Sequence, residues 1–433
     1  MVYSNRFEND NPDNEYVPND RCNIVFILVM LVGFGVLMPW NMFITIAPEY
    51  YVNYWFKIDG NETWYSEKFM SLLTVSSQLP NATINVINLF LIIGGPLIYR
   101  VFAPVCFNIF NVGAVLLLVL FVDPSIGGMT WFFWITLLIV MFINFSNGLY
   151  ENSVFGVFAD FPHKYTSGVL IGNNMCGLMI SFLKLAVTLL MKEDVKLTAI
   201  IYFSISLTIL IMCGLALLTI TKQEFYHFYH EKGIEIRMKA ETHKPSLPIL
   251  WETFKACFGQ LFNVWFTFAI TLTVFPVVMT ATKRTGSGVI EKTIESIDEV
   301  FTLITTFVAF NLFATIGAIA ASKVHWPSAK NMVYAVVARA LFVPIFFFCN
   351  YRPDTRTFPV IIHSTEVYVF AVIAMSFTHG YLSSLAMSYC PKVVDMHHSR
   401  FAAQLSACCL MIGLFTGAVF SVCIENLVSS SFF

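Results

Sequence analysis

Residues 24–47 read IVFILVMLVGFGVLMPWNMFITIA, an apolar run without a single charged side chain. A transmembrane helix needs about 20 mostly apolar residues, so this run predicts a membrane span. The polar segment 1–23 does not open like a signal peptide. No small-residue cleavage site follows the apolar run 24–47. We therefore expect the run to stay in the protein as its first span.

The composition extends this prediction to the whole chain. Of the 433 residues, 57% are hydrophobic and 12% are charged, and the mean hydropathy is +0.71. Soluble domains carry about 25% charged residues, so a lipid bilayer is the expected surrounding. The net charge of -2 gives no basic surface for nucleic acid, and no nucleic-acid partner is expected.

Further apolar runs along the chain predict an all-α polytopic protein with eleven transmembrane helices. Two of the runs, in the second and fourth spans, are interrupted by amides and by Glu151. Polar groups within a span usually face the interior of the helix bundle, so these interruptions mark an interior. The expected spans are 24–47, 69–98, 103–122, 131–158, 166–191, 197–221, 258–281, 298–321, 331–350, 360–388 and 399–426.

The long polar segment 222–257 divides the predicted spans into six (24–221) and five (258–426). Lys and Arg are more frequent on the side of the N-terminus, which predicts a cytoplasmic N-terminus 1–23 and a cytoplasmic 222–257 loop. The loop 48–68 and the tail 427–433 are then extracellular. This orientation exposes the sequon Asn61-Glu62-Thr63 to glycosylation.

Polar side chains at membrane depth are the candidate functional residues, because burying them in lipid costs free energy. Gln78, Asn81 and Asn85 recur at helical spacing, and Glu151 is a carboxyl among amides. Glu151 pairs with a cation, stays protonated or meets a solute. Arg339 either faces a solute in the interior of the bundle or donates hydrogen bonds to carbonyls of neighbouring helices. Amides beside aromatic rings suit a planar, hydrogen-bonding solute.

The sequence contains no catalytic or metal-binding signature. A P-loop, an H-E-x-x-H motif, a G-x-S-x-G motif and a Gly-rich dinucleotide turn are all missing. His227 and His230 would share one face of a helix in the 222–257 loop. Such a face is more commonly exposed to solvent than part of a metal site. We expect no enzyme, no cofactor and no metal.

Several strings, in order along the chain, resemble the equilibrative nucleoside transporter family. The first span matches the pattern L-P-W-N-x-F-x-T, and later spans carry further strings of the family. They are 37–45 (LMPWNMFIT), 147–156 (NGLYENSVFG), 165–174 (YTSGVLIGNN), 275–276 (FP), 338–344 (ARALFVP), 380–387 (GYLSSLAM) and 417–421 (GAVFS).

The resemblance implies a major-facilitator-like arrangement of six plus five helices and facilitative transport of nucleosides, with nucleobases as a possible substrate, by alternating access. It implies a multi-pass protein, with the plasma membrane as the expected location. Glu151 stands where mammalian relatives have a Gln that hydrogen-bonds the nucleobase. The implied substrate-binding residues are Leu37, Trp40, Asn41, Ile44, Gln78, Asn81, Glu151, Phe275, Phe307 and Asn311.

The eighth span departs from the family. The family pattern is F-N-x-F-D-x-x-G-R, whose Asp and Arg contact the ribose; here both charged positions are alanine, Ala314 and Ala318. Replacing only one of the two residues would leave the other as a buried charge without a partner. Replacing both leaves the eighth span less polar and without an unpaired charge. Transport of another small polar or cationic solute, or a receptor-like role without transport, are therefore alternatives.

Overall fold

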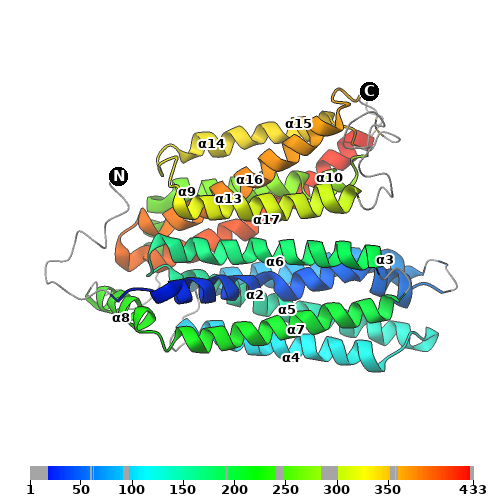
Figure 1. Cartoon of the computed structure of the whole chain (residues 1–433), viewed down its shortest axis with the longest axis horizontal. Helices are drawn as coiled ribbons and strands as arrows, with labels where there is room; N and C mark the ends of the chain where they lie inside the picture. The colour runs from blue at the N-terminus through cyan, green and yellow to red at the C-terminus, as the bar shows by residue number, and fades with distance from the viewer. Residues whose placement is uncertain are drawn as a thin grey trace.

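The computed structural model describes residues 18–58, 61, 63–90, 97–190, 194–239, 247–283, 301–351, 356 and 359–429. Figure 1 shows two groups of long helices lying side by side, with the earlier helices in one group and the later helices in the other. Apart from two isolated bridges, Ile58 with Asn61 and Thr282 with Tyr351, these residues hold no β-structure. A chain in lipid must satisfy its backbone hydrogen bonds within each segment, and helices do so.

The first group is built from six long helices. Asp20 begins it, because its carboxylate accepts hydrogen bonds from the backbone N–H groups of Val25 (3.0 Å) and Phe26 (3.1 Å). The elements are α2 (Ile24–Ala47) with its π-helical continuation η2 (Pro48–Trp55), α3 (Trp64–Phe90), α4 (Leu97–Phe121), α5 (Met129–Phe158), α6 (His163–Leu190) and α7 (Val195–Ile220).

The second group follows a short helix, α8 (Glu224–Lys239), which lies across one end of the first group (Figure 1). Its elements are α9 (Leu247–Val274) with α10 (Val277–Thr280), η4 (Leu303–Val308) leading into α13 (Ala309–Lys323), α14 (Met332–Ala338), η5 (Arg339–Leu341), α15 (Phe342–Phe348), α16 (Thr365–Tyr389) and α17 (Ser399–Ser429).

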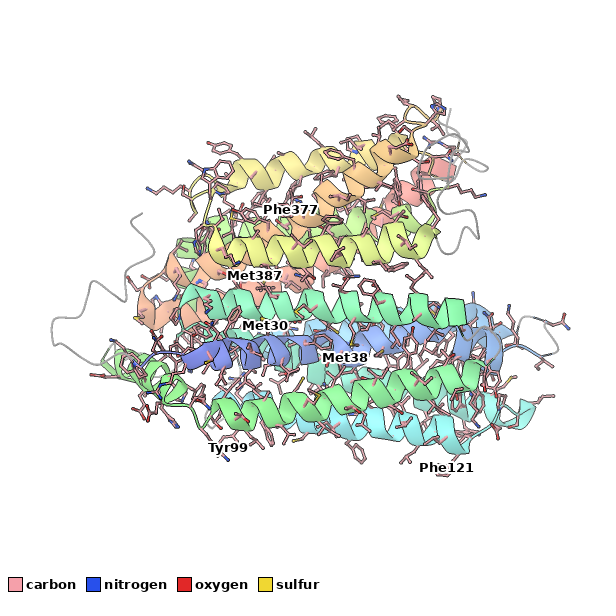
Figure 2. The ribbon with its side chains drawn as sticks, viewed as in Figure 1. Met30, Met38, Tyr99, Phe121, Phe377 and Met387 are labelled. Carbon is pink, nitrogen blue, oxygen red and sulfur yellow. The ribbon has the colours of Figure 1, made fainter. Side chains whose placement is uncertain are left out.

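Nine helices within the described ranges are long and apolar enough to cross a membrane. They correspond to the predicted spans except for the second, which is α3 with its amides, and the ninth, where residues 332–348 form a shorter apolar segment. The all-helical membrane architecture is confirmed, and the count of eleven spans stays a prediction. Figure 2 shows Tyr99 and Phe121 at the edge of the first group that faces away from the second.

Three boundaries differ from the sequence-based expectation. The first helix continues through Trp55, because Pro48 enters without breaking the helical backbone and Tyr50, Tyr51 and Trp55 are buried. The segment 222–257 holds α8 and the start of α9. The ninth span changes to a 3-10 turn, η5, ahead of Pro344, which cannot donate a backbone hydrogen bond.

Glycines bring three pairs of helices into backbone contact. A Cβ added to Gly172 of α6 would overlap the carbonyl oxygen of Met30 in α2. In the same way, Gly380 of α16 meets the carbonyl of Ala314 in α13, and Gly417 of α17 meets that of Ala269 in α9. Small residues at helix contacts are the usual device for association in lipid, where apolar side chains alone give no preference for protein over lipid.

We expect Gly380→Ala to lower the thermal stability of the detergent-purified protein. The new methyl group would push α16 away from α13, and overpacking of this kind costs roughly 1–3 kcal/mol. The apparent melting temperature is measured by heating samples and monitoring the remaining monodisperse protein by size-exclusion chromatography.

Gly113→Ala on α4 is the matched control, because a Cβ there meets nothing within 4 Å. It should melt at the wild-type temperature or above, since alanine favours helix over glycine by about 1 kcal/mol. Equal melting temperatures for the two variants would contradict the packing argument.

Candidate functional site

The surface between the two helix groups contains most of the candidate residues. Helix α6 of the first group packs against α13 and α16 of the second, and α3 and α5 pack against α17. Figure 1 shows α6 and α13 running side by side along this boundary. A solute path between the groups would have these helices as its walls.

The candidates from the first span lie on α2. They are half-buried and pack against the hydrophobic core of the first group, except that Asn41 supplies polar atoms. The Asn41 carbonyl accepts a hydrogen bond from the Thr45 hydroxyl (2.6 Å), and its side chain lies within hydrogen-bond reach of the Cys176 thiol on α6. The four residues are Leu37, Trp40, Asn41 and Ile44.

An amide cluster joins α3, α5 and α17. The Asn85 amide donates to the side-chain oxygen of Asn81 (2.8 Å), and the Asn152 amide reaches Asn85 (3.3 Å) and the carbonyl of Gln404 (3.4 Å). The Cys408 thiol of α17 donates to the Asn85 carbonyl (3.4 Å). Two predicted residues fall on this face: Asn81 within the cluster, and Gln78 one turn earlier on α3, half-buried.

Glu151 lies next to this cluster on α5. Its exposed fraction is 2%, and it sits beside Cys408 of the second group. Its carboxyl makes no hydrogen bond or ion pair with another residue in the described part of the chain. A buried carboxyl costs free energy unless it is neutralised or finds a partner, so this group is available for a ligand donor or a cation.

The predicted residues of the second group form a stack of aromatic rings beside an amide. Phe275 stacks on Phe310 (3.9 Å between centroids) and meets the edge of Phe307 (5.8 Å). The Asn311 amide donates to the Phe307 carbonyl (2.9 Å) and to the Ser181 hydroxyl of α6 (3.0 Å). Its oxygen fills the space left by Gly177 on α6. Asn311 therefore bridges the two helix groups.

Arg339 is buried within the second group and anchors neighbouring helices. Its guanidinium donates to the carbonyls of Thr267 (3.0 Å) and Met375 (3.3 Å) and to the Thr271 hydroxyl (2.8 Å). The same hydroxyl lies 3.0 Å from Nδ1 of His379. Of the two roles expected for Arg339, the structure shows the anchoring one.

Ala314 and Ala318, at the positions of the family's Asp and Arg, are fully buried in α13. Backbone atoms of Ala314 lie against Gly380 of α16, so the two helices are in close contact there. Asn311, a half-buried residue of this helix, contacts Ser181 of α6.

The end of the molecule near α8 is held together by polar contacts between the groups. The hydroxyls of Ser167 and Ser388 lie 3.1 Å apart, and the Lys392 ammonium donates to the Phe161 carbonyl (3.0 Å). The carboxylate of Asp160 lies 3.9 Å from the Arg400 guanidinium. Each of these contacts would have to break for solute to pass between the groups at this end.

Helix α8 covers the same end with aromatic side chains. Phe225 and Tyr229 pack on Phe161, and Phe225 also packs on Tyr165 (5.0 Å). Burial raises the pKa of the Tyr226 phenol to about 12, so this ring stays neutral at physiological pH. The helix braces the segment that supplies Asp160 and Phe161.

The loop histidines have no metal-site geometry. His230 stacks on Tyr226 (5.3 Å, 16° between the ring planes). Among the described residues, no three His, Cys, Asp or Glu side chains come together in a way that could hold a metal ion.

Four residues of this surface and of the Arg339 network lie outside the sequence-based set: Ser181, Gln404, Cys408 and His379. None of them belongs to a string or motif identified in the sequence. Only the pairing of α6 with α13, and of α5 with α17, brings Ser181, Gln404 and Cys408 next to predicted residues.

Comparison with solved structures supports the fold. The protein is similar to the major facilitator superfamily transporter FucP in its outward conformation (TM-score 0.55, 9% identity, covering 93% of this chain and 91% of FucP). It is also similar to a D-xylose–proton symporter (TM-score 0.50, 10% identity, 92% and 88% covered). At such low identity the likeness concerns the fold alone, and it confirms the expected major-facilitator-like arrangement.

Sequence comparison gives relatives over nearly the whole chain. Human equilibrative nucleoside transporter 1 is 25% identical over 95% of this chain and 99% of its own length. Rat equilibrative nucleoside transporter 3 is 26% identical (95% and 90%), and Arabidopsis thaliana equilibrative nucleotide transporter 1 is 25% identical (93% and 86%). These relatives are transporters, so the chain stands among transporters and not among enzymes.

The family profile described as "Nucleoside transporter" matches residues 137–426. This range runs from α5, with Glu151, through α6 to α17, and so contains both sides of the boundary between the helix groups. The chain is therefore a multi-pass membrane protein that belongs to the nucleoside transporter family, as its resemblance to the equilibrative nucleoside transporters predicted.

Proposed function

We propose that this protein carries nucleosides, and nucleobases as well, across a membrane by facilitated diffusion with alternating access. The observation that carries the proposal is the set of polar and aromatic groups at the boundary between the helix groups. Glu151 lies on one side, and the ring of Phe275 and the amide of Asn311 lie on the other. A carrier needs comparable affinity in both of its states, because a ligand that strongly favours one state traps it.

The proposed solute path combines residues of both groups. Leu37, Trp40, Asn41 and Ile44 of α2, Gln78 and Asn81 of α3, and Glu151 of α5 would face Phe275, Phe307 and Asn311. Most of them are half-buried, as expected of side chains that border a space rather than fill a core. Rings would stack on a planar base while amides and the carboxyl read its edges.

Closure at the α8 end supports the alternating part of the proposal. Ser167–Ser388, Lys392–Phe161 and Asp160–Arg400 would hold this end shut while solute enters from the other. Breaking these contacts, together with a movement of α8, would open the path at the α8 end. None of these contacts needs ATP or a bound cofactor.

A second candidate substrate class, other small polar or cationic solutes, is favoured by two observations. Ala314 and Ala318 leave α13 without the family's ribose contacts, and Glu151 adds an acid where a cation or two N–H donors would bind. A receptor-like role without transport would use the same scaffold.

Uptake of radiolabelled adenosine, uridine and adenine in a host without its own carriers tests the function. We expect saturable flux, with adenine competing about as well as adenosine because ribose contacts from α13 are missing. Cells with the empty vector give the background. If the protein reaches the surface and none of the three solutes shows saturable flux, the transport proposal is wrong.

Glu151→Gln tests the role of the carboxyl. A carboxylate accepts two hydrogen bonds, whereas a glutamine offers one acceptor group and one donor group. Guanosine presents two adjacent N–H donor groups and inosine only one, so wild type with Glu151 ionised should prefer guanosine by roughly tenfold, the effect of one hydrogen bond to a charged group. The variant should reduce this preference to within roughly twofold.

Glu252→Gln is the matched control, because Glu252 is an exposed acid on α9. It should keep the wild-type ratio. Acid that protonates Glu151 should also reduce the guanosine preference in wild type and not in Glu151→Gln. A wild-type ratio near one, or a pH profile that Glu151→Gln leaves unchanged, would remove Glu151 from the solute path.

We further propose that the N-terminus is cytoplasmic, the tail 427–433 is extracellular and the protein resides in the plasma membrane. Asn61 is exposed, which supports an accessible sequon. Deglycosylation should increase gel mobility of wild type and of Thr63→Ser, which keeps the sequon. Asn61→Gln should show no shift; a shift that survives in this variant would contradict modification at Asn61.

A further inference from the structure

A lateral groove opens between α3, α4 and α5, with a volume of about 450 Å³. Helix α4 lies at the edge of the first group, far from the second group (Figure 1). The groove is therefore separate from the boundary where the solute path is proposed. Its wall consists mainly of the rings and aliphatic side chains of these three helices, including Phe107, Phe142 and Phe145.

Proline and alanine leave room for the groove. Pro80 lies inside α3 and Pro104 inside α4, and Ala103 beside it is too small to fill the space. A proline within a helix removes a hydrogen bond and tends to kink the chain. Ser146, a polar residue of the wall, donates its hydroxyl to the Pro104 carbonyl (2.9 Å) and so offers no proton to the groove.

The groove continues the lipid-facing surface of the protein. Phe107, Met141, Phe142 and Phe145 have exposed fractions of 40–45% on α4 and α5, two helices of membrane-spanning length. Pro80 and Phe145 lie near the middle of their helices, which places the groove at the depth of the hydrocarbon core. Lipid is the material in contact with this surface.

The size of the groove decides between lipid and protein. If a methylene group takes about the space of a water molecule, roughly 30 Å³, then the groove holds roughly fifteen methylenes, most of one acyl chain. A helix with its side chains is about 10–12 Å across and rises about 5.4 Å per turn, so one turn alone takes roughly 420–610 Å³, and the groove cannot hold a helix that crosses the membrane. An empty groove would leave its lining without dispersion contacts.

We propose that the α3–α4–α5 groove is a binding site for one acyl chain of a bilayer phospholipid. The chain would pack between Phe107, Phe142 and Phe145 and against Ala103, and it would support the part of α3 around Pro80. Pro80 directly precedes Asn81 and the groove reaches Leu149, two residues before Glu151. The lipid would thus lie behind one wall of the proposed solute path.

Native mass spectrometry of the full chain, reconstituted in phosphatidylcholine and released in detergent, tests the site. Wild type should retain one phosphatidylcholine. Ala103→Trp, which fills the groove, should reduce the lipid-bound fraction roughly tenfold, and Ala103→Leu should give an intermediate reduction. Phosphatidylcholine with a diazirine in its acyl chain should label α4 and α5 peptides around Phe107 and Phe142 in wild type more than in Ala103→Trp.

Leu117→Trp is the matched control, because Leu117 is an exposed residue of the same helix outside the groove. It should retain lipid like wild type. Equal retention by Ala103→Trp and Leu117→Trp, no retained lipid in wild type, or a dimer mass that Ala103→Trp abolishes would each overturn the proposal, the last in favour of a second copy. Lipid retention is measured without solute, so failure of transport does not affect the result.

Discussion

In a bilayer, an apolar side chain gains little by exchanging lipid for another helix, so helices associate through close packing and hydrogen bonds. In this protein both devices meet on α6. Gly172 lets the backbone of α6 touch α2, and Gly177 makes room for Asn311 of α13. Ser167 reaches Ser388 of α16. Helix α6 carries small or polar residues toward each of these neighbours, and together with α3 and α5, which pack against α17, it joins the two helix groups.

Contacts within a group differ in kind from contacts between groups. Within a group, glycines such as Gly172, Gly380 and Gly417 bring backbone against backbone, which fixes the distance between helices. Between groups, the contacts at Asn311, Lys392 and Arg400 are made by single side chains. A hydrogen bond between membrane helices contributes on average only about 0.6 kcal/mol. Two helix groups joined by contacts of this size can separate and rejoin, as the proposed alternating access requires.

Much of the fold follows from the sequence, because apolar runs of the right length and polar interruptions on one face are local features. The strings around Trp40, Glu151 and Arg339 also pointed to the family. Other features depend on which helices become neighbours. The Arg339–Thr271–His379 network, the Ser181 partner of Asn311 and the groove beside Pro104 each join residues from different helices. Hydropathy does not encode these pairings.

The alanines of α13 and the acid of α5 are two parts of one change. Backbone atoms of Ala314 lie where a Cβ on Gly380 would be, so α13 and α16 are in close contact at this point. With alanine at both positions, α13 carries no buried charge there that would need a partner. In the proposed site, recognition then moves across the boundary to Glu151, whose carboxyl is held by no described residue. There the substrate would supply the missing partner, so we expect a solute with N–H donors or a positive charge to fit the proposed site better than one recognised through its ribose.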